Sequence, residues 1–213
     1  MNALTAPTPL GNDARSIATR TRLISSAIEV LVDLGFAKTT GVEVCRRSGL
    51  TRGALNHHFP DFADLLVETL QTLYTRLLKV NVDAHGGPFE QVLLSSYERV
   101  TKPEFKAVIE LWLASCNDPE FGARLSVAIE KSAILFSPAM VLANVQGADA
   151  DDGDALYYMI TEALIGIGVG RAVGRGEGTA HEVRVLQKLR SLAQDHDRAS
   201  STSRNTGEKI SKT

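Results

Sequence analysis

The sequence predicts an all-α fold, with a small N-terminal helical domain followed by a larger one. Apolar residues recur at three- and four-residue spacing along most of the chain. No segment shows the sustained alternation of polar and β-branched residues that is typical of strands. Breaks such as Lys102-Pro103 and Asp118-Pro119 divide the periodic stretches into helices of ordinary length.

The composition excludes several classes of protein. The chain has 213 residues, 44% hydrophobic and 23% charged, which excludes a collagen-like, low-complexity or wholly disordered chain. Cys45 and Cys116 lie far apart, which excludes a disulfide framework and suits a reducing compartment. Residues 1–11 lack the regions of a signal peptide, and the longest apolar stretch, 157–173, contains Glu162 and Arg171. We expect a cytoplasmic protein without a membrane segment.

Charge is unevenly distributed, although the net charge is only −2. Residues 14–60 hold seven basic and three acidic side chains, whereas residues 61–196 hold 12 basic and 19 acidic ones. A basic segment on an acidic body is typical of a protein that places one region against nucleic acid. Chance fluctuation is the alternative explanation of this charge distribution. Sequence motifs are therefore needed to distinguish a nucleic-acid-binding region from chance.

The breaks divide the chain into four regions. We expect a flexible arm over residues 1–13, a first helical domain over 14–61, a second over 62–196 and a disordered tail over 197–213. Helices are expected near 13–34, 39–49, 51–59, 62–83, 88–100, 104–115, 119–136, 152–174 and 179–195.

The segment from Thr40 to Phe59 is the most informative. One helix reaches Gly49, and a second starts at Thr51, a hydroxyl N-cap. Such a short turn with a glycine is typical of a helix-turn-helix. The second helix carries small and hydrogen-bonding side chains, which suit contact with phosphates or base edges. A tight helical hairpin inside an ordinary bundle is the structural alternative.

From Thr19 onward the sequence resembles the DNA-binding domain of the tetracycline-repressor (TetR) family. The match rests on a combination of positions: Ala27, Gly35, Thr39, Thr40, Val44, Gly49, Leu50, Thr51, Gly53, Leu55, His58, Phe59 and Leu65. The resemblance implies an all-helical, dimeric transcription regulator, usually a repressor. Three N-terminal helices would bind DNA, and later helices would form a small-molecule pocket and the dimer interface.

The resemblance also assigns DNA contacts. Thr40 and Thr51 match phosphate-contacting positions, and Arg52 and His57 match positions that face bases. The expected DNA-binding set is Thr40, Thr51, Arg52, Gly53, Ala54, Asn56, His57 and His58. The implied partner is a double-stranded operator whose half-sites lie about one helical turn apart or somewhat more.

Two positions depart from the family pattern. Asn56 stands where the family usually has Tyr, and Phe62 where it usually has Lys. Each lost phosphate contact weakens the salt-dependent part of DNA affinity. We hypothesise that Arg15, Arg20 and Arg22 compensate, and that Asn56 contacts an adenine edge. The alternative function is a ligand-binding helical protein of the same fold with weak or lost DNA binding.

The acidic two-thirds of the chain contains helix faces rich in apolar side chains, which form either plain core or the lining of a cavity. The expected lining consists of Leu73, Leu77, Tyr97, Ile109, Trp112, Leu113, Cys116 and Phe136. No cluster of basic residues lies on these faces, so we expect a small apolar or weakly polar effector.

Glycines recur every four residues in one apolar stretch. Gly166, Gly170 and Gly174 would share a helix face, and each costs about 1 kcal/mol against alanine. Close helix–helix contact would offset that cost. With the resemblance, we expect this stripe to lie at the interface of a homodimer together with Val185 and Leu189; close packing within one chain is the alternative.

The sequence shows no catalytic or metal-binding pattern. His57 and His58 are adjacent and would face different sides of a helix, so they would not share a metal ion. Residues 166–178 are glycine-rich but have no register of a dinucleotide fingerprint. We expect a binding protein rather than an enzyme, with no cofactor and no metal.

Overall fold

The computed structural model describes residues 12–78, 88–133 and 150–210, and within these ranges the chain is helical without strands. The N-terminal part contains α1 (Asn12–Leu34), the 3-10 turn η1 (Phe36–Lys38), α2 (Gly41–Ser48) and α3 (Arg52–His58). The later helices are α4 (Phe62–Leu78), α5 (Pro88–Thr101), α6 (Pro103–Asn117), α7 (Pro119–Ala133), α9 (Ala150–Ala172) and α10 (Ala180–Ile210). The all-α prediction is confirmed.

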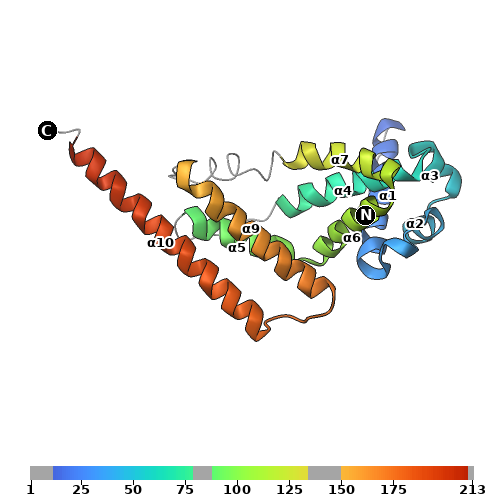
Figure 1. The fold of residues 1–213 in the computed structure, drawn as a ribbon. Helices are drawn as coiled ribbons and strands as arrows, with labels where there is room; N and C mark the ends of the chain where they lie inside the picture. The colour runs from blue at the N-terminus through green and yellow to red at the C-terminus, as the bar shows by residue number, and fades with distance from the viewer. Residues whose placement is uncertain (1–11, 79–87, 134–149, 211–213) are drawn as a thin grey trace, which may run out of the picture.

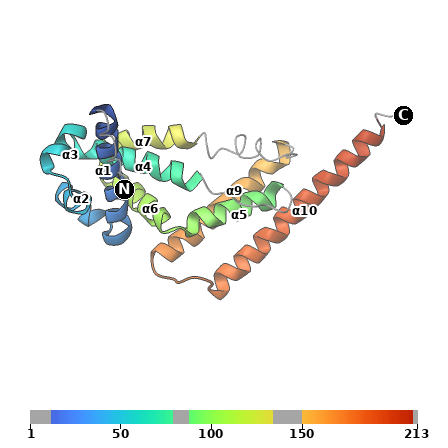
Figure 2. The same cartoon turned by 180° about the vertical axis from the view of Figure 1, so that it is seen from behind.

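The helices build an elongated molecule with α1–α3 gathered at one end (Figure 1). We call α1, η1, α2 and α3 the three-helix unit. Helices α4, α6 and α7 lie against it, and α5, α9 and α10 lie at the other end, where α10 extends beyond its neighbours (Figures 1 and 2). Because α6 packs against both α1 and α9, it joins the two ends.

One continuous apolar core runs through the molecule. In the three-helix unit, Leu23, Ala27 and Leu31 lie four residues apart on α1 and are fully buried. Leu55 and Phe59 from α3 pack into the same core. Burial of a side chain as large as Phe59 stabilises the fold by about 2–3 kcal/mol, so the core fixes the inner side of α3.

The start of α7 follows its local sequence signal. Asp118 Oδ1 accepts hydrogen bonds from the backbone N–H groups of Glu120 (3.1 Å) and Phe121 (3.0 Å). Pro119 opens the helix, where its missing N–H costs nothing. The predicted boundary before α7 is confirmed.

The C-terminal prediction needs a correction, because α10 continues as a helix to Ile210 where a disordered tail from residue 197 was expected. Asp197 is buried, and its carboxylate accepts hydrogen bonds from the N–H groups of Phe89 (3.0 Å) and Glu90 (3.3 Å). The carboxylate thus caps the start of α5. Composition alone does not reveal a cap whose partner lies more than a hundred residues away.

The end of α9 differs from the prediction, and two other predicted helix ends are not described by the structure. Helix α9 ends at Ala172, and Gly174 beyond it has a φ of +86°, so it is a turn residue and not the last member of a helical stripe. The expected helix ends at 83 and 136 lie outside the described residues. No helix within the described ranges combines the length and apolarity needed to cross a bilayer.

Candidate functional site

Three residues set the geometry of the helix-turn-helix. Thr40 Oγ1 accepts a hydrogen bond from the Glu43 N–H at 3.3 Å, and Thr51 Oγ1 accepts one from the Ala54 N–H at 3.2 Å. Each hydroxyl therefore caps one helix. Gly49 has a φ of +64° and ends α2 in the left-handed conformation that glycine adopts at low cost.

Helix α3 has one inner and one outer side. Leu55 and Phe59 face the core. The remaining side of α3 and its N-cap carry the predicted DNA-contacting residues, of which Thr51, Arg52, Gly53, Asn56 and His57 are exposed and Ala54 and His58 partly exposed. Thr40, the cap of α2, is exposed as well. The structure therefore brings all the predicted DNA-contacting positions onto α2, α3 and their caps, at one end of the molecule (Figure 1).

Arg20 is partly exposed, and its guanidinium makes contacts within the chain that the hypothesis of a phosphate contact did not include. Its Nε lies 3.0 Å from Glu68 Oε2, and its Nη1 donates to the His58 carbonyl oxygen at 2.8 Å. The guanidinium carbon also lies 4.3 Å from the centroid of the Phe59 ring. Arg20 therefore ties α1, α3 and α4 together and orients α3 from behind.

The other hypothesised arginines and the two departures from the family pattern differ in exposure. Arg15 and Arg22 are exposed, and Asn56 is exposed on α3. Phe62 is only partly exposed and packs against the core; a methyl group on Gly41 would approach its ring to 3.9 Å. At this position the chain has packing between α4 and α2 where the family usually has a positive charge.

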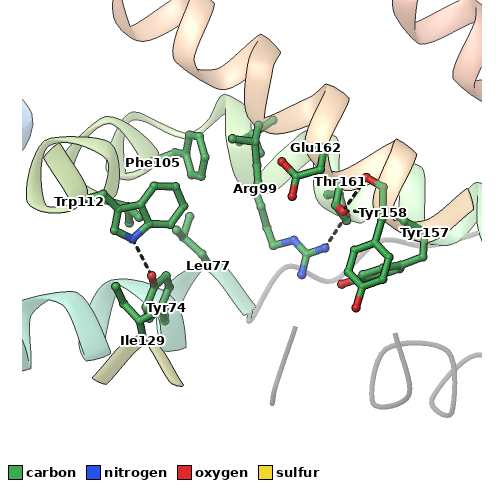
Figure 3. A pocket seen from close by; sticks show the side chains of 14 residues that line it. Tyr74, Leu77, Arg99, Phe105, Trp112, Ile129, Tyr157, Tyr158, Thr161 and Glu162 are labelled. Atoms are coloured by element: carbon green, nitrogen blue, oxygen red, sulfur yellow. Dashed lines mark hydrogen bonds between the residues drawn. The ribbon is translucent and has the colours of Figure 1, made fainter. Parts of the chain in front are cut away.

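Next to the three-helix unit, five helices line an open cavity of about 270 Å³ (Figure 3). The helices α4, α5, α6, α7 and α9 each contribute side chains, and the lining is mostly apolar and aromatic. The lining residues are Tyr74, Leu77, Ser96, Arg99, Val100, Phe105, Val108, Trp112, Ile129, Tyr157, Tyr158, Thr161, Glu162 and Ile165. A concave apolar site with a few polar groups is typical of a small-molecule pocket.

Polar groups are placed at specific points of this lining. Trp112 Nε1 donates a hydrogen bond to the Tyr74 hydroxyl at 2.8 Å (Figure 3). Arg99 Nη2 donates to Ser96 Oγ at 2.5 Å. Burial raises the pKa of the Tyr74 and Tyr157 hydroxyls and lowers the pKa of the Arg99 guanidinium. The tyrosines therefore stay neutral at physiological pH, and the guanidinium, whose ordinary pKa is far above 7, stays charged.

The structure corrects much of the predicted lining. Leu77 and Trp112 line the cavity; Leu73 and Ile109 are buried outside its lining; Leu113 and Cys116 are exposed; and Phe136 lies outside the described residues. The predicted stripe on α6 shares Trp112 with the lining but is otherwise displaced around the helix, because the other cavity contacts of α6 are Phe105 and Val108. The sequence identifies an apolar helix face but does not reveal which of its residues line a cavity.

Tyr97 belongs to a polar cluster outside the cavity lining. Its hydroxyl donates to Glu182 Oε1 at 2.8 Å, and Arg171 Nη2 contacts both the hydroxyl (2.8 Å) and that carboxylate oxygen (2.6 Å). The Arg171 hydrogen bond, more than that of Tyr97, lowers the pKa of Glu182. The cluster connects α5, α9 and α10.

The sequence analysis missed Arg99 and the residues of α9 in the cavity. Ser96, Arg99 and Val100 stand at i, i+3 and i+4, so a face of α5 carrying one arginine among apolar residues was visible in the sequence. Tyr157 and Thr161 were likewise four residues apart. Their convergence with α6 is a long-range property that spacing alone does not predict.

The predicted dimer residues fall into two groups. Gly166 is exposed, with no atom within 4 Å of the place a side chain would take. Gly170 and Leu189 are instead buried, and Val185 packs against the chain's own core. The close contact inside the chain is made by Gly168, which the prediction did not include. A methyl group there would come within 2.5 Å of the Phe105 ring.

Helix α6 connects the cavity with the three-helix unit. One side carries Phe105 and Trp112 into the cavity. On another side, Lys106 Nζ donates to the Val32 carbonyl oxygen at 3.2 Å, and the Glu110 carboxylate accepts a hydrogen bond from the backbone N–H of Phe36. Movement of α6 would therefore be transmitted directly to the end of α1 and to η1.

Comparison with known proteins identifies the helix-turn-helix. The family model of the bacterial regulatory proteins of the tetR family matches residues 23–69, which span α2, α3 and parts of α1 and α4. The chain therefore carries a DNA-binding domain of the TetR family. It is thus a transcriptional regulator of the TetR type, and the resemblance seen in its sequence is confirmed.

Other proteins that are similar to this TetR-type regulator in sequence or in structure match it over most of its length. The HTH-type transcriptional regulator CymR of Pseudomonas putida is 24% identical over 162 residues, which cover 73% of this chain and 80% of CymR. A transcriptional regulator from Rhodococcus sp. superimposes with a TM-score of 0.61 at 16% identity, covering 84% of this chain and 95% of the other. The multidrug binding protein EbrR, solved with imidazole, gives 0.59 at 21% identity, covering 87% and 97%. These structural matches extend the shared fold beyond the helix-turn-helix to the cavity-forming helices.

Proposed function

We propose that this TetR-type regulator is a homodimeric, sequence-specific repressor that releases its operator when a small molecule occupies the cavity. The observation that carries the proposal is the outer side of α3. Its polar residues are exposed at one end of the molecule, while Leu55, Phe59 and Arg20 hold the helix from behind. Such a rigidly supported helix suits insertion into a major groove.

Within this proposal the contacts divide into two kinds. Thr40 and Thr51 bind phosphates of the DNA. The residues that face base edges are Arg52, Ala54, Asn56 and His57. His58 lies near the DNA backbone. Gly53 has only Thr51 Oγ1 (3.8 Å) near the place of a side chain, which allows close approach to DNA. Phosphate contacts fix position and base contacts provide specificity.

The proposed release passes through α6. A ligand that binds the cavity contacts Phe105 and Trp112, and the same helix contacts Val32 and Phe36 through Lys106 and Glu110. A ligand with different affinity for the DNA-bound and released arrangements shifts the balance between them, and couplings of about 1–3 kcal/mol are typical.

The proposed dimer uses the outer faces of α9 and α10. Exposed apolar side chains occur there, among them Met159 (51% exposed), Val169 (38%) and Val183 (41%). Gly166 lies on α9 near Val169, and no atom of its own chain comes within 4 Å of the place a side chain would take, so a second helix can approach closely there. Two copies related by a twofold axis would present two α3 helices to successive grooves.

Selection from genomic DNA tests the proposal. Purified protein is incubated at physiological salt with sheared DNA from its own organism, and the retained fragments are sequenced. The proposal predicts strong enrichment of few fragments that share a palindromic site. Recovery of fragments in proportion to their abundance, by a folded protein, would instead favour a ligand-binding protein with lost DNA specificity.

A further inference from the structure

Arg99 places a positive charge in the wall of a cavity that is otherwise mainly apolar and aromatic. In Figure 3 its side chain lies between the Trp112–Tyr74 pair on one side and Tyr157 with Tyr158 on the other. Arg99 is partly buried, and burial disfavours its charged form, as the lowered pKa indicates. An anionic group of a ligand in the cavity would lie beside this positive charge where burial reduces screening by solvent.

The guanidinium is suited to one class of chemical group. It presents five N–H donors in a planar fork, and two parallel donors match the two oxygens of a carboxylate. The hydrogen bond to Ser96 Oγ at 2.5 Å uses one Nη2 donor and fixes the fork on α5. The side chain is thus preorganised for an acceptor within the cavity.

The aromatic walls define the rest of the ligand. The Trp112 indole is oriented by its hydrogen bond to Tyr74 and lies edge-on to Phe105, with ring centroids 6.2 Å apart. Flat rings in offset or edge-on arrangements pack well against another ring. A volume of about 270 Å³ is at the small end of ligand pockets, which favours a ligand of one or two rings.

Glu162 lines the same cavity and raises the alternative of a cationic ligand, since aromatic rings also attract cations. However, Glu162 is exposed, whereas Arg99 is partly buried. Solvent screens the exposed carboxylate more strongly than the guanidinium. A cation in the cavity would also be repelled by Arg99 at low dielectric, so the balance favours an anion.

We propose that the effector is a small aromatic acid whose carboxylate or comparable anionic group binds Arg99 while its ring packs against Phe105 and Trp112. This inference rests on the proposed role of the cavity as the effector site. It also revises the sequence-based expectation of an uncharged or weakly polar effector, which overlooked a single arginine among apolar residues.

Three probes that share a benzyl group test the charge preference: phenylacetate, phenylacetamide and benzylammonium. Trp112 is the chain's single tryptophan, so its fluorescence reports on the cavity directly. At neutral pH we expect phenylacetate to bind at least about tenfold more tightly than the neutral amide, because charge-assisted hydrogen bonds exceed neutral ones by this order. Benzylammonium should bind most weakly.

The variant Arg99→Met should reduce phenylacetate affinity at least about tenfold while changing amide affinity little. Arg190→Met is the matched control, because Arg190 pairs with Glu90 on α5 and does not line the cavity. DNA binding by each variant checks that it is folded.

Each remaining result overturns the inference in a distinguishable way. Equal affinity for acid and amide, unchanged in Arg99→Met, would leave the cavity as an effector site but remove the anion preference. Tightest binding of benzylammonium, lost in Glu162→Gln, would assign a cationic ligand instead. No fluorescence response to any probe at millimolar concentration would contradict both the inference and the proposed effector site, while leaving DNA binding to its own test.

Discussion

The three-helix unit depends on interactions between residues close in sequence, whereas the cavity depends on segments that are far apart in sequence. In the unit, the decisive hydrogen bonds join residues three apart, as in the caps at Thr40 and Thr51, and one left-handed glycine closes the turn. The cavity is lined from five helices that span residues 74 to 165. Locally encoded structure gives a fixed surface for DNA, whereas a site assembled from distant segments can change its lining without changing the fold.

The largest expected effect comes from the core of the three-helix unit. Phe59→Ala removes a ring that is 2% exposed and supports α3, and we expect a loss of about 3–5 kcal/mol in the free energy of unfolding. Tyr158→Ala, at the cavity and 53% exposed, should cost less than about 1 kcal/mol. Urea denaturation of both variants measures the difference. Similar losses would contradict the contrast between a packed unit and a more open cavity.

Two glycines with the same backbone conformation test how tightly α6 packs against η1. Gly35 has a φ of +82° and Gly174 one of +86°, so an alanine strains both by about 1 kcal/mol. At Gly35 the methyl group would also come within 2.9 Å of Glu110 Oε2, while at Gly174 it meets nothing within 4 Å. Gly35→Ala should therefore lower the unfolding midpoint more than Gly174→Ala. Equal shifts in thermal denaturation would argue against tight packing of α6 on η1.

A pH-dependent effect on stability is predicted for the polar cluster of Tyr97, Arg171 and Glu182. Glu182 is buried, and the hydrogen bond from Arg171 is the main reason its pKa lies below the ordinary 4.5. A carboxylate with a lowered pKa stabilises the fold above its unfolded pKa, and this contribution is lost as the pH falls through the folded pKa. Glu182→Gln should therefore cost about 1–3 kcal/mol at pH 7.

The difference between wild type and Glu182→Gln should shrink as the pH falls from about 5 towards 3. Urea unfolding at several pH values measures it. Glu130→Gln, at an exposed position on α7, is the control. A difference that stays constant across this range would show that the charge of Glu182 does not contribute to the loss.

The sequence allowed prediction where the physical cause was local. The N-caps, the turn glycine and the alternation of inner and outer residues on α3 all lie within twenty residues, so the helix-turn-helix was predicted together with its exposed residues. The start of α7 at Asp118-Pro119 was predicted for the same reason.

Prediction failed where the cause was long-range. The contact of Arg20 was missed because its partner Glu68 is 48 residues away, and Asp197 was assigned to a tail because it caps a helix 108 residues earlier. Arg99 was overlooked because its significance depends on aromatic residues of α6 and α9. Sequence periodicity identifies an apolar face but not which part of it meets a void.

Equilibrium binding of DNA by the outer side of α3 tests the account most directly. Fluorescence anisotropy with a selected operator and an unrelated duplex, at two salt concentrations, compares wild type with Arg52→Ala. Arg175→Ala is the matched control, since Arg175 is exposed between α9 and α10. We predict that wild type prefers the operator by about 10³ or more. Arg52→Ala should lose about 1–3 kcal/mol of operator affinity and part of that preference, while Arg175→Ala keeps both. Equal affinity of wild type for both duplexes, or unchanged binding by Arg52→Ala, would contradict the assignment of α3 as the element that reads the operator.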